Sequence, residues 1–150
     1  MIIGHNLIKK YIQSRKLVIE PFSDEIVREA GLDLRIAEDT TMEGGEVKLI
    51  WTLEYIRMPV DLIGFCNLRS TWARAGLIIS PTIVDPGFEG QLVIEVYNPT
   101  RHPIKIAGGE RFLHLILAKC EGAIPYRGRY QGQKLERDSL HSMGKPKFTS

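Results

Sequence analysis

The feature that most constrains the fold is a succession of short hydrophobic runs separated by turn signals. Stretches rich in Gly, Pro, Asn and Asp, such as EGG, MPVD, DPGFEG and NPTRHP, interrupt the runs. Short strands bounded by such turns are typical of sandwiches, jelly rolls and barrels. The chain therefore is expected to be all-β, with no internal repeat and no domain boundary. The runs are LDLRIA, VKLIWTLEYIRM, DLIGFCNL, LIISPTIV, QLVIEVYN, HPIKIA and RFLHLILAKCEG.

Two segments depart from this β pattern. Residues 4–14 place apolar side chains at helical spacing, which predicts an N-terminal helix. Residues 69–76, RSTWARAG, predict a helix of barely two turns. Ser70 or Thr71 would cap its start, and Gly76 would end it in a left-handed conformation.

Composition narrows the class of protein. The chain has 150 residues, 43% of them hydrophobic and 25% charged, with a formal net charge of +2, as in a soluble globular domain. The basic residues are scattered, which argues against a DNA-binding or RNA-binding protein. No apolar stretch reaches the ~18 residues that span a membrane. The first residues lack the apolar core of a signal peptide, so a cytoplasmic protein is expected.

The two cysteines, Cys66 and Cys120, each lie within an apolar run and have no partner at short spacing. That pattern predicts two buried free thiols rather than a disulfide scaffold or a zinc site. His114 alternates with apolar residues in FLHLIL, which predicts a packed or interface histidine rather than a catalytic one.

Three positions carry both a structural and a functional interpretation. The start of the predicted helix at 69–76 is a connector between strands or an anion site built from N–H groups, hydroxyls and an arginine. In QLVIEVY, Glu95 is an exposed residue on a strand with one solvent-facing side. If the strand is instead buried on both faces, Glu95 is a carboxyl with a tunable pKa suited to acid–base chemistry. Asp85, in VDPGFEG, starts a tight turn or binds a hydroxyl at the mouth of a pocket.

Taken together, several segments resemble the dCTP deaminase/dUTPase superfamily, and most of all its short archaeal dCTP deaminases and dUTPases. The resemblance runs from the first residues to about Gln133. It implies a distorted β jelly roll with short helices and a homotrimer with active sites between subunits. The chain is expected to form a single domain over residues 1–133, and the polar composition of residues 134–150 predicts a flexible tail. The segments are GLDLR, RSTWARAGL, TIVDPGFEG, LVIEVYN, GERFLHLIL and PYRGRYQGQ, in this order and spacing.

The resemblance also assigns roles to individual positions. The substrate would be a pyrimidine deoxynucleoside triphosphate with Mg²⁺ on its phosphates. Arg69, Ser70 and Thr71 would hold the triphosphate, Arg74 would lie near the reacting base, and Asp85 would bind the deoxyribose 3′-hydroxyl.

The remaining implied contacts lie on the glutamate strand and near the C-terminus. Val93, Ile94 and Glu95 would line the base pocket. Tyr126, Arg129 and Gln133 would close over the nucleotide. Deaminases of the family usually have Lys where this chain has Arg129, which keeps the charge but not the geometry.

In the deaminase branch the strand glutamate, here Glu95, is the general acid–base for the conversion of dCTP to dUTP and ammonia, which supplies dUMP and dTTP synthesis. Ser70 and Arg74 would orient the water and the base. The sequence lacks the H-x-E…P-C-x-x-C arrangement of zinc deaminases, so a zinc-independent reaction is expected.

Two hydrolytic alternatives and one non-catalytic alternative stay open. A dUTPase would use Asp85 to activate water for cleavage of dUTP to dUMP and pyrophosphate, and a bifunctional enzyme would perform both reactions. The loop before Asp85 ends in Thr82-Ile83-Val84, without the His-Arg of bacterial deaminases. A trimeric nucleotide binder or regulator is a more remote alternative, and dTTP inhibition is common among the deaminases.

Overall fold

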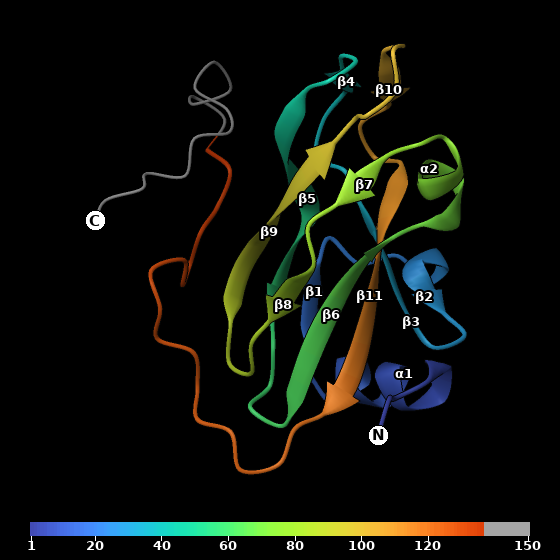
Figure 1. Cartoon of the computed structure of the whole chain (residues 1–150). Helices are drawn as coiled ribbons and strands as arrows, with labels where there is room; N and C mark the ends of the chain where they lie inside the picture. Colours follow the sequence, from blue (N-terminus) through green and yellow to red (C-terminus); the bar gives the residue numbers. More distant parts are fainter. Residues whose placement is uncertain (137–150) are drawn as a thin grey trace.

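The computed structural model describes residues 1–136 as a mostly β structure with short helices (Figure 1). Part of the expected flexible tail, 137–150, lies outside the described residues. The elements are α1 (His5–Gln13), β1 (Val18–Glu20), the 3₁₀ helix η1 (Asp24–Ile26), β2 (Val27–Arg28), β3 (Gly31–Arg35), β4 (Thr40–Met42), β5 (Val47–Arg57), β6 (Leu62–Leu68), α2 (Ser70–Arg74), β7 (Ile78–Ile79), β8 (Thr82–Val84), β9 (Glu89–Tyr97), β10 (Ile104–Ile106) and β11 (Arg111–Lys119).

The strands form two large antiparallel sheets and one small one. A four-stranded sheet has the order β1-β5-β9-β7, and a five-stranded sheet has the order β2-β3-β11-β6-β8. β10 and β4 form a separate two-stranded sheet. Strands far apart in sequence are neighbours in both large sheets, as in a jelly roll. The predicted all-β fold with short helices is confirmed.

Period-2 alternation builds the core between the large sheets. On β9, Leu92, Ile94 and Val96 are buried, whereas Val93 and Glu95 are half-buried. The same alternation on β11 buries a row of leucines. Apolar side chains from both sheets therefore meet in one cluster, and this burial is the main source of stability.

Two details of the strand prediction were wrong. The run LIISPTIV was expected to be one strand, but it forms β7 in the four-stranded sheet and β8 in the five-stranded sheet. Ser80 and Pro81 separate them, and Pro cannot donate a ladder hydrogen bond, so the strand breaks there. β4 was not expected, because its three residues lie within a polar stretch.

The predicted N-terminal helix is confirmed as α1, which packs with Ile8 and Tyr11 buried. No helix within residues 1–136 combines the length and the apolar character needed to cross a membrane. Both cysteines are free thiols, as expected, but only Cys66 is buried, and Cys120 is half-exposed because it follows the end of β11.

Candidate active site

The predicted helix at 69–76 forms as α2 directly after β6. Its N-cap is Arg69, whose carbonyl accepts from the N–H groups of Trp72 and Ala73 at 3.0 and 3.1 Å. The expected cap by Ser70 or Thr71 was therefore wrong, because both residues lie inside the helix.

The end and the orientation of α2 follow from two residues. Gly76 has φ of +108°, the predicted left-handed end. The indole Nε1 of Trp72 donates to the carbonyl of Arg111 at 3.1 Å, which ties α2 to β11. Ser70, Thr71 and Arg74 remain exposed on this anchored helix.

The buried carboxylate of Asp33 on β3 organises the charges next to α2. Asp33 is 3% exposed. Its Oδ1 lies 2.8 Å from Nδ1 of His114, and its Oδ2 lies 3.0 Å from Nε of Arg69. Arg28 Nε and Arg111 Nη1 lie 3.7 and 3.8 Å from the same Oδ2. Such a carboxylate is stable away from water only because it is paired on both oxygens.

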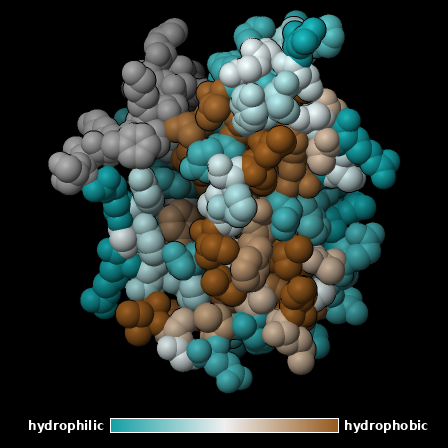
Figure 2. All heavy atoms as spheres, in the orientation of Figure 1, coloured by the Kyte–Doolittle hydropathy of each residue, from teal (hydrophilic) through white to brown (hydrophobic). Residues whose placement is uncertain are grey.

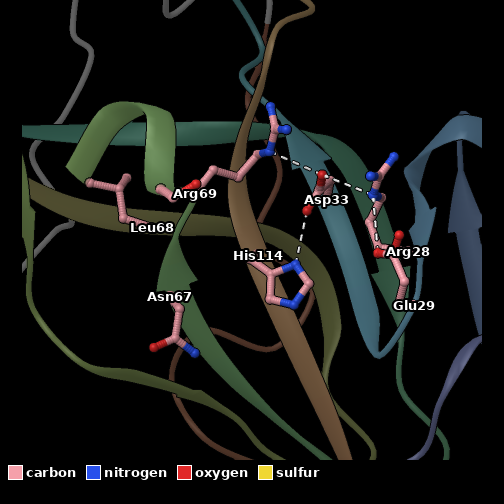
Figure 3. Close-up of a pocket in the computed structure, with 8 residues that line it drawn as sticks. Arg28, Glu29, Asp33, Asn67, Leu68, Arg69 and His114 are labelled. Carbon is pink, nitrogen blue, oxygen red and sulfur yellow. Dashed lines mark hydrogen bonds and ion pairs between the residues drawn. The ribbon is translucent and has the colours of Figure 1, made fainter. Parts of the chain in front are cut away.

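A pocket of about 310 Å³ opens beside this carboxylate (Figure 3). β3, β6 and β11 contribute to its walls, and the first residues of α2 complete it. Figure 3 shows the imidazole of His114 and the guanidinium groups of Arg28 and Arg69 directed toward Asp33. The pocket is lined by Arg28, Glu29, Asp33, Asn67, Leu68, Arg69, Ser70 and His114.

His114 thus has a more specific role than packing. Its ring lies so close to Gly31 that a Cβ on Gly31 would be 2.7 Å from Nε2. Asp33 and His114 were not among the site residues inferred from the sequence. GLDLR was among the segments that carried the family resemblance, but its aspartate was given no role.

The candidate base, Glu95, lies on β9 and is half-buried rather than enclosed. Thr82 Oγ1 lies 3.4 Å from its Oε2, and Ser80 N–H donates to its backbone carbonyl at 3.2 Å. Burial and the negative charge of Glu95 raise the pKa of the Cys66 thiol to about 12. Next to Glu95, the side chain of Ile94 points into the core, so a base pocket would be lined by its neighbours instead.

Asp85 occupies the tight turn between β8 and β9. Phe88 N–H donates to its carbonyl at 3.1 Å, and Gly87 has φ of +77°, the conformation that such a turn requires. The side chain of Asp85 is exposed. The turn interpretation is thus correct, and it leaves the carboxylate available to a ligand.

The C-terminal segment packs along this turn and the start of β9. The ring of Tyr126 meets that of Phe88 edge-on at 5.7 Å between centroids. Gln133 Nε2 donates to the carbonyl of Gln91 at 2.7 Å, and Gln91 N–H donates to the carbonyl of Gln133 at 2.9 Å. Arg129 is exposed.

Gln131 was missed by sequence reasoning but holds the same segment. Its Oε1 accepts from Glu89 N–H at 2.7 Å, and its Nε2 donates to the carbonyl of Gly87 at 2.9 Å. The contacts continue to Leu135, whose N–H donates to Oε1 of Gln91 at 2.6 Å.

The expected site residues fall into two groups within one chain. One group lies on α2. The other comprises the β8–β9 turn, the C-terminal segment and the exposed face of β9. In Figure 1, α2 lies at the upper right and the β8–β9 turn at the lower left, so these two elements are separated in space. Neither Asp85 nor Glu95 lines the pocket that contains Arg69 and Ser70.

Comparisons with known proteins agree with this architecture. The model of the family described as dCTP deaminase-like matches residues 37–120, more than half of the chain. A protein of Sulfolobus islandicus rod-shaped virus 1, named a probable deoxyuridine 5′-triphosphate nucleotidohydrolase, is 48% identical, and the match covers 89% of this chain and 95% of that protein. A protein of Pyrobaculum aerophilum named dCTP deaminase is 42% identical, over 89% of this chain and 93% of that protein.

Solved structures show the same fold. A 2′-deoxycytidine 5′-triphosphate deaminase of Agrobacterium tumefaciens matches with a TM-score of 0.67 at 18% identity, covering 77% of this chain and 47% of that one. The EIAV dUTPase matches with a TM-score of 0.59 at 25% identity, covering 75% of this chain and 96% of that one. By its matched residues and by its relatives, the chain belongs to the dCTP deaminase-like family.

Proposed function

We propose that this chain is a hydrolase that deaminates dCTP to dUTP and ammonia without zinc. The observation that carries the proposal is a glutamate, Glu95, held by Thr82 on a strand of the family fold, in a chain about 40% identical to several archaeal proteins named dCTP deaminase. A carboxylate in that position supplies the basicity that a metal-bound water would otherwise provide.

In the proposed reaction, Glu95 takes a proton from the water that attacks C4 of cytosine. It passes that proton to the ring nitrogen and then assists the departure of ammonia, so that one water enters and one ammonia leaves. Ser70 and Arg74, both exposed on α2, orient the water and the base. Glu95 is half-buried, which exposes the carboxylate to a substrate while limiting its solvation.

The nucleotide contacts follow the two groups of residues. On α2, Arg69, Ser70 and Thr71 hold the triphosphate, since the guanidinium fork and the hydroxyls match phosphate oxygens. In the group on the β8–β9 turn and β9, Asp85 binds the 3′-hydroxyl and the Val93–Glu95 segment borders the base.

The C-terminal residues complete the nucleotide site in this proposal. Tyr126 and Gln133 already hold the segment beside the Asp85 turn, and Arg129 lies exposed on it. The nucleotide would therefore meet an ordered segment at this position, with the domain ending near Gln133 and the tail following.

Magnesium fits the proposal as an ion carried by the nucleotide. Both oxygens of Asp33 contact cationic or imidazole nitrogens, and no group of three His, Cys, Asp or Glu side chains within residues 1–136 is arranged to hold a metal. Mg²⁺ commonly keeps several waters and binds substrate phosphates. When bound, it would neutralise phosphate charge, while the protein orients the phosphates through Arg69.

A homotrimer would join the two groups of site residues. Because α2 and the β8–β9 turn are separated in one chain, a single site that used both would take one of them from a second copy. Figure 2 shows hydrophobic residues gathered over β6, β7 and β8 on the face seen in Figure 1. Phe65, Ile78 and Ile83 on these strands are 40%, 55% and 46% exposed, and such a patch suits an interface between subunits.

A dUTPase is the second candidate function, favoured by the 48% identity to the viral protein named a probable deoxyuridine 5′-triphosphate nucleotidohydrolase. In that reaction the exposed carboxylate of Asp85 activates water for cleavage of dUTP to dUMP and pyrophosphate. A bifunctional enzyme would convert dCTP to dUMP in one site. We also propose that the protein acts in the cytoplasm and binds neither DNA, RNA nor membranes. dTTP would inhibit it.

The deciding experiment is product analysis with dCTP and, separately, dUTP in the presence of Mg²⁺. Chromatography that separates dCTP, dUTP and dUMP, together with an ammonia assay, distinguishes all three enzymes. Formation of dUTP and ammonia from dCTP supports the deaminase. Untouched dCTP together with dUMP from dUTP would replace it by the dUTPase. Thermal stabilisation by nucleotides without turnover would indicate a regulator, since ligand at 100 times its Kd adds about 2.7 kcal/mol.

A further inference from the structure

We propose that Asp33 and His114 are positioning residues that fix the guanidinium of Arg69 for the phosphates of the nucleotide. The proposal rests on the proposed function, because Arg69 is assigned there to the triphosphate. It concerns two residues of the five-stranded sheet: Asp33 contacts Arg69 at the N-cap of α2, and His114 contacts Asp33.

The geometry ties Arg69 at two points. Its Nε contacts Oδ2 of Asp33 at 3.0 Å, and its Nη1 reaches the carbonyl of Arg111 at 3.4 Å. An unrestrained arginine loses considerable rotamer freedom when it binds an anion. Two fixed contacts remove that freedom in advance, so the other N–H groups of the guanidinium are preorganised for an anion.

His114 in turn fixes the carboxylate. Its Nδ1 lies 2.8 Å from Oδ1 of Asp33, while Arg69 takes Oδ2, so the two contacts define the rotation of the carboxyl plane. The ring can occupy this place because residue 31 is glycine. Gly31 therefore leaves room for His114, His114 fixes Asp33, and Asp33 fixes Arg69.

The charge balance leaves the pocket positive. Arg28, Arg69 and Arg111 surround one buried carboxylate, and Glu29, whose side chain is 87% exposed, pairs with Arg28 at 3.7 Å. Three positive and two negative side chains give a net charge of +1 beside a pocket of about 310 Å³. Asp33 thus orders the arginines without cancelling their attraction for phosphate.

The two effects of Asp33 have opposite signs, which makes the proposal testable with Asp33→Asn. Removal of a negative charge alone would strengthen the binding of an anion. Loss of the anchor would instead release Arg69 and weaken it. We expect the second effect to dominate, with a rise of about 10- to 100-fold in KM for the nucleotide and a smaller change in kcat, because phosphate contacts are the same in the ground and transition states.

The experiment measures KM, kcat and, by calorimetry, the Kd of inorganic tripolyphosphate for the full-length protein. Asp33→Asn should weaken tripolyphosphate binding by a similar factor. Asp61→Asn is the matched control, since Asp61 also accepts a side-chain hydrogen bond and an ion pair but lies against α1 and β11. It should leave both constants within about twofold of wild type.

Two further variants test the transmission from His114. Asn can place its amide nitrogen where Nδ1 of His114 lies, so His114→Asn should stay near wild type, and His114→Phe should reproduce most of the Asp33→Asn effect. With Arg69→Lys, which keeps the charge but loses the Nε contact, Asp33→Asn should add little. A double mutant whose effects simply add would refute the link through Arg69.

The outcomes separate this proposal from the proposed function. Unchanged or tighter tripolyphosphate binding by Asp33→Asn, with its thermal stability retained, overturns the positioning role. If the wild-type protein turns over neither dCTP nor dUTP, the proposed function fails, but the tripolyphosphate measurements still decide whether Asp33 positions Arg69. If Asp33→Asn loses fold as judged by circular dichroism, the comparison of His114→Asn with His114→Phe decides.

Discussion

Oε1 of Glu54 lies 2.6 Å from Nε of Arg35, and this ion pair joins β5 of one large sheet to β3 of the other. Glu54 is 0% exposed. Its Oε2 also accepts from the N–H of Arg35 at 2.9 Å. Burial raises the pKa of Glu54, and the hydrogen bonds and charge of Arg35 oppose that rise. The pair therefore offsets a desolvation cost inside the core.

Glu54→Gln should destabilise the protein by about 3–5 kcal/mol, because it leaves the guanidinium of Arg35 without its countercharge in a buried place. Chemical denaturation monitored by circular dichroism measures the change. The control is Glu20→Gln, which breaks a pair with Arg15 at 3.9 Å in which both side chains are more than 60% exposed. That loss should be below about 1 kcal/mol. Equal losses would contradict a buried inter-sheet role.

The stability of the protein should fall in acid partly through Asp61. The hydrogen bond from Tyr11 lowers the pKa of Asp61, and Lys119 adds to the effect. A lowered pKa in the folded state stabilises the protein above the unfolded pKa of about 4, and that contribution disappears as the pH falls through the folded pKa. Since Asp61 is half-exposed, its share is at most about 1 kcal/mol.

Thermal melts between pH 7 and pH 2 test this account of Asp61. Asp61→Asn should melt earlier than wild type at pH 7 and approach it at low pH. Tyr11→Phe, which keeps the packing of the ring, should show the same convergence, because the tyrosine hydroxyl is the leading cause of the shift. A constant difference across the pH range would refute it.

Cys66 should resist alkylation in the folded protein. Its pKa of about 12 leaves about one thiolate in ten thousand at pH 8. Iodoacetamide should therefore modify the half-exposed Cys120 first. Peptide mapping by mass spectrometry, with a denatured sample as reference, follows both sites. Similar rates for the two thiols under native conditions would contradict the burial and the raised pKa of Cys66.

Glu95→Gln should lower kcat for deamination about 10²- to 10⁴-fold, the usual contribution of a general acid–base, with little change in KM. The amide keeps the size of the side chain and its contact with Thr82 but cannot accept a proton. Steady-state kinetics with ammonia detection measures the loss. Glu89→Gln, on the same strand and paired with Tyr55 at 3.4 Å, is the control and should remain within about twofold of wild type.

Gln131→Ala should loosen the C-terminal segment, because the amide loses three backbone hydrogen bonds, with Glu89 at 2.7 Å, Gly87 at 2.9 Å and Tyr126 at 3.2 Å. Limited trypsin digestion should then cut faster after Arg127 and Arg129, which are exposed. Gln13→Ala, at the exposed end of α1, is the control. An unchanged digestion rate would mean that Tyr126 and Gln133 hold the segment without help from Gln131.

Alternation and turn residues predicted most strands, because those signals are local. They misjudged LIISPTIV, since the assignment of β7 and β8 to different sheets depends on partners more than ten residues away. A fully buried and paired carboxylate occurs at Glu54, whereas Glu95 is half-buried. Alternation defines two faces of a strand but does not say which one is covered.

The element that carries each expected site residue was predictable from the sequence, but the contacts between residues on different elements were not. The motif around Arg69 and the strand of Glu95 are local patterns, so the sequence placed each on its element. The link between Asp33 and His114 joins residues 81 positions apart, and sequence spacing carries no sign of it. Contacts made by pairing β3 with β11 appear only once the sheet is formed.

The short link between β7 and β8 affects the orientation of the Glu95 carboxylate. Ser80 holds the backbone of Glu95, Thr82 contacts its carboxylate, and the two belong to a stretch that leaves one sheet for the other. The direction in which the carboxylate points is therefore tied to the spacing between the layers. If Glu95 transfers protons as proposed, core substitutions that change this spacing should slow the reaction without altering any of the proposed nucleotide contacts.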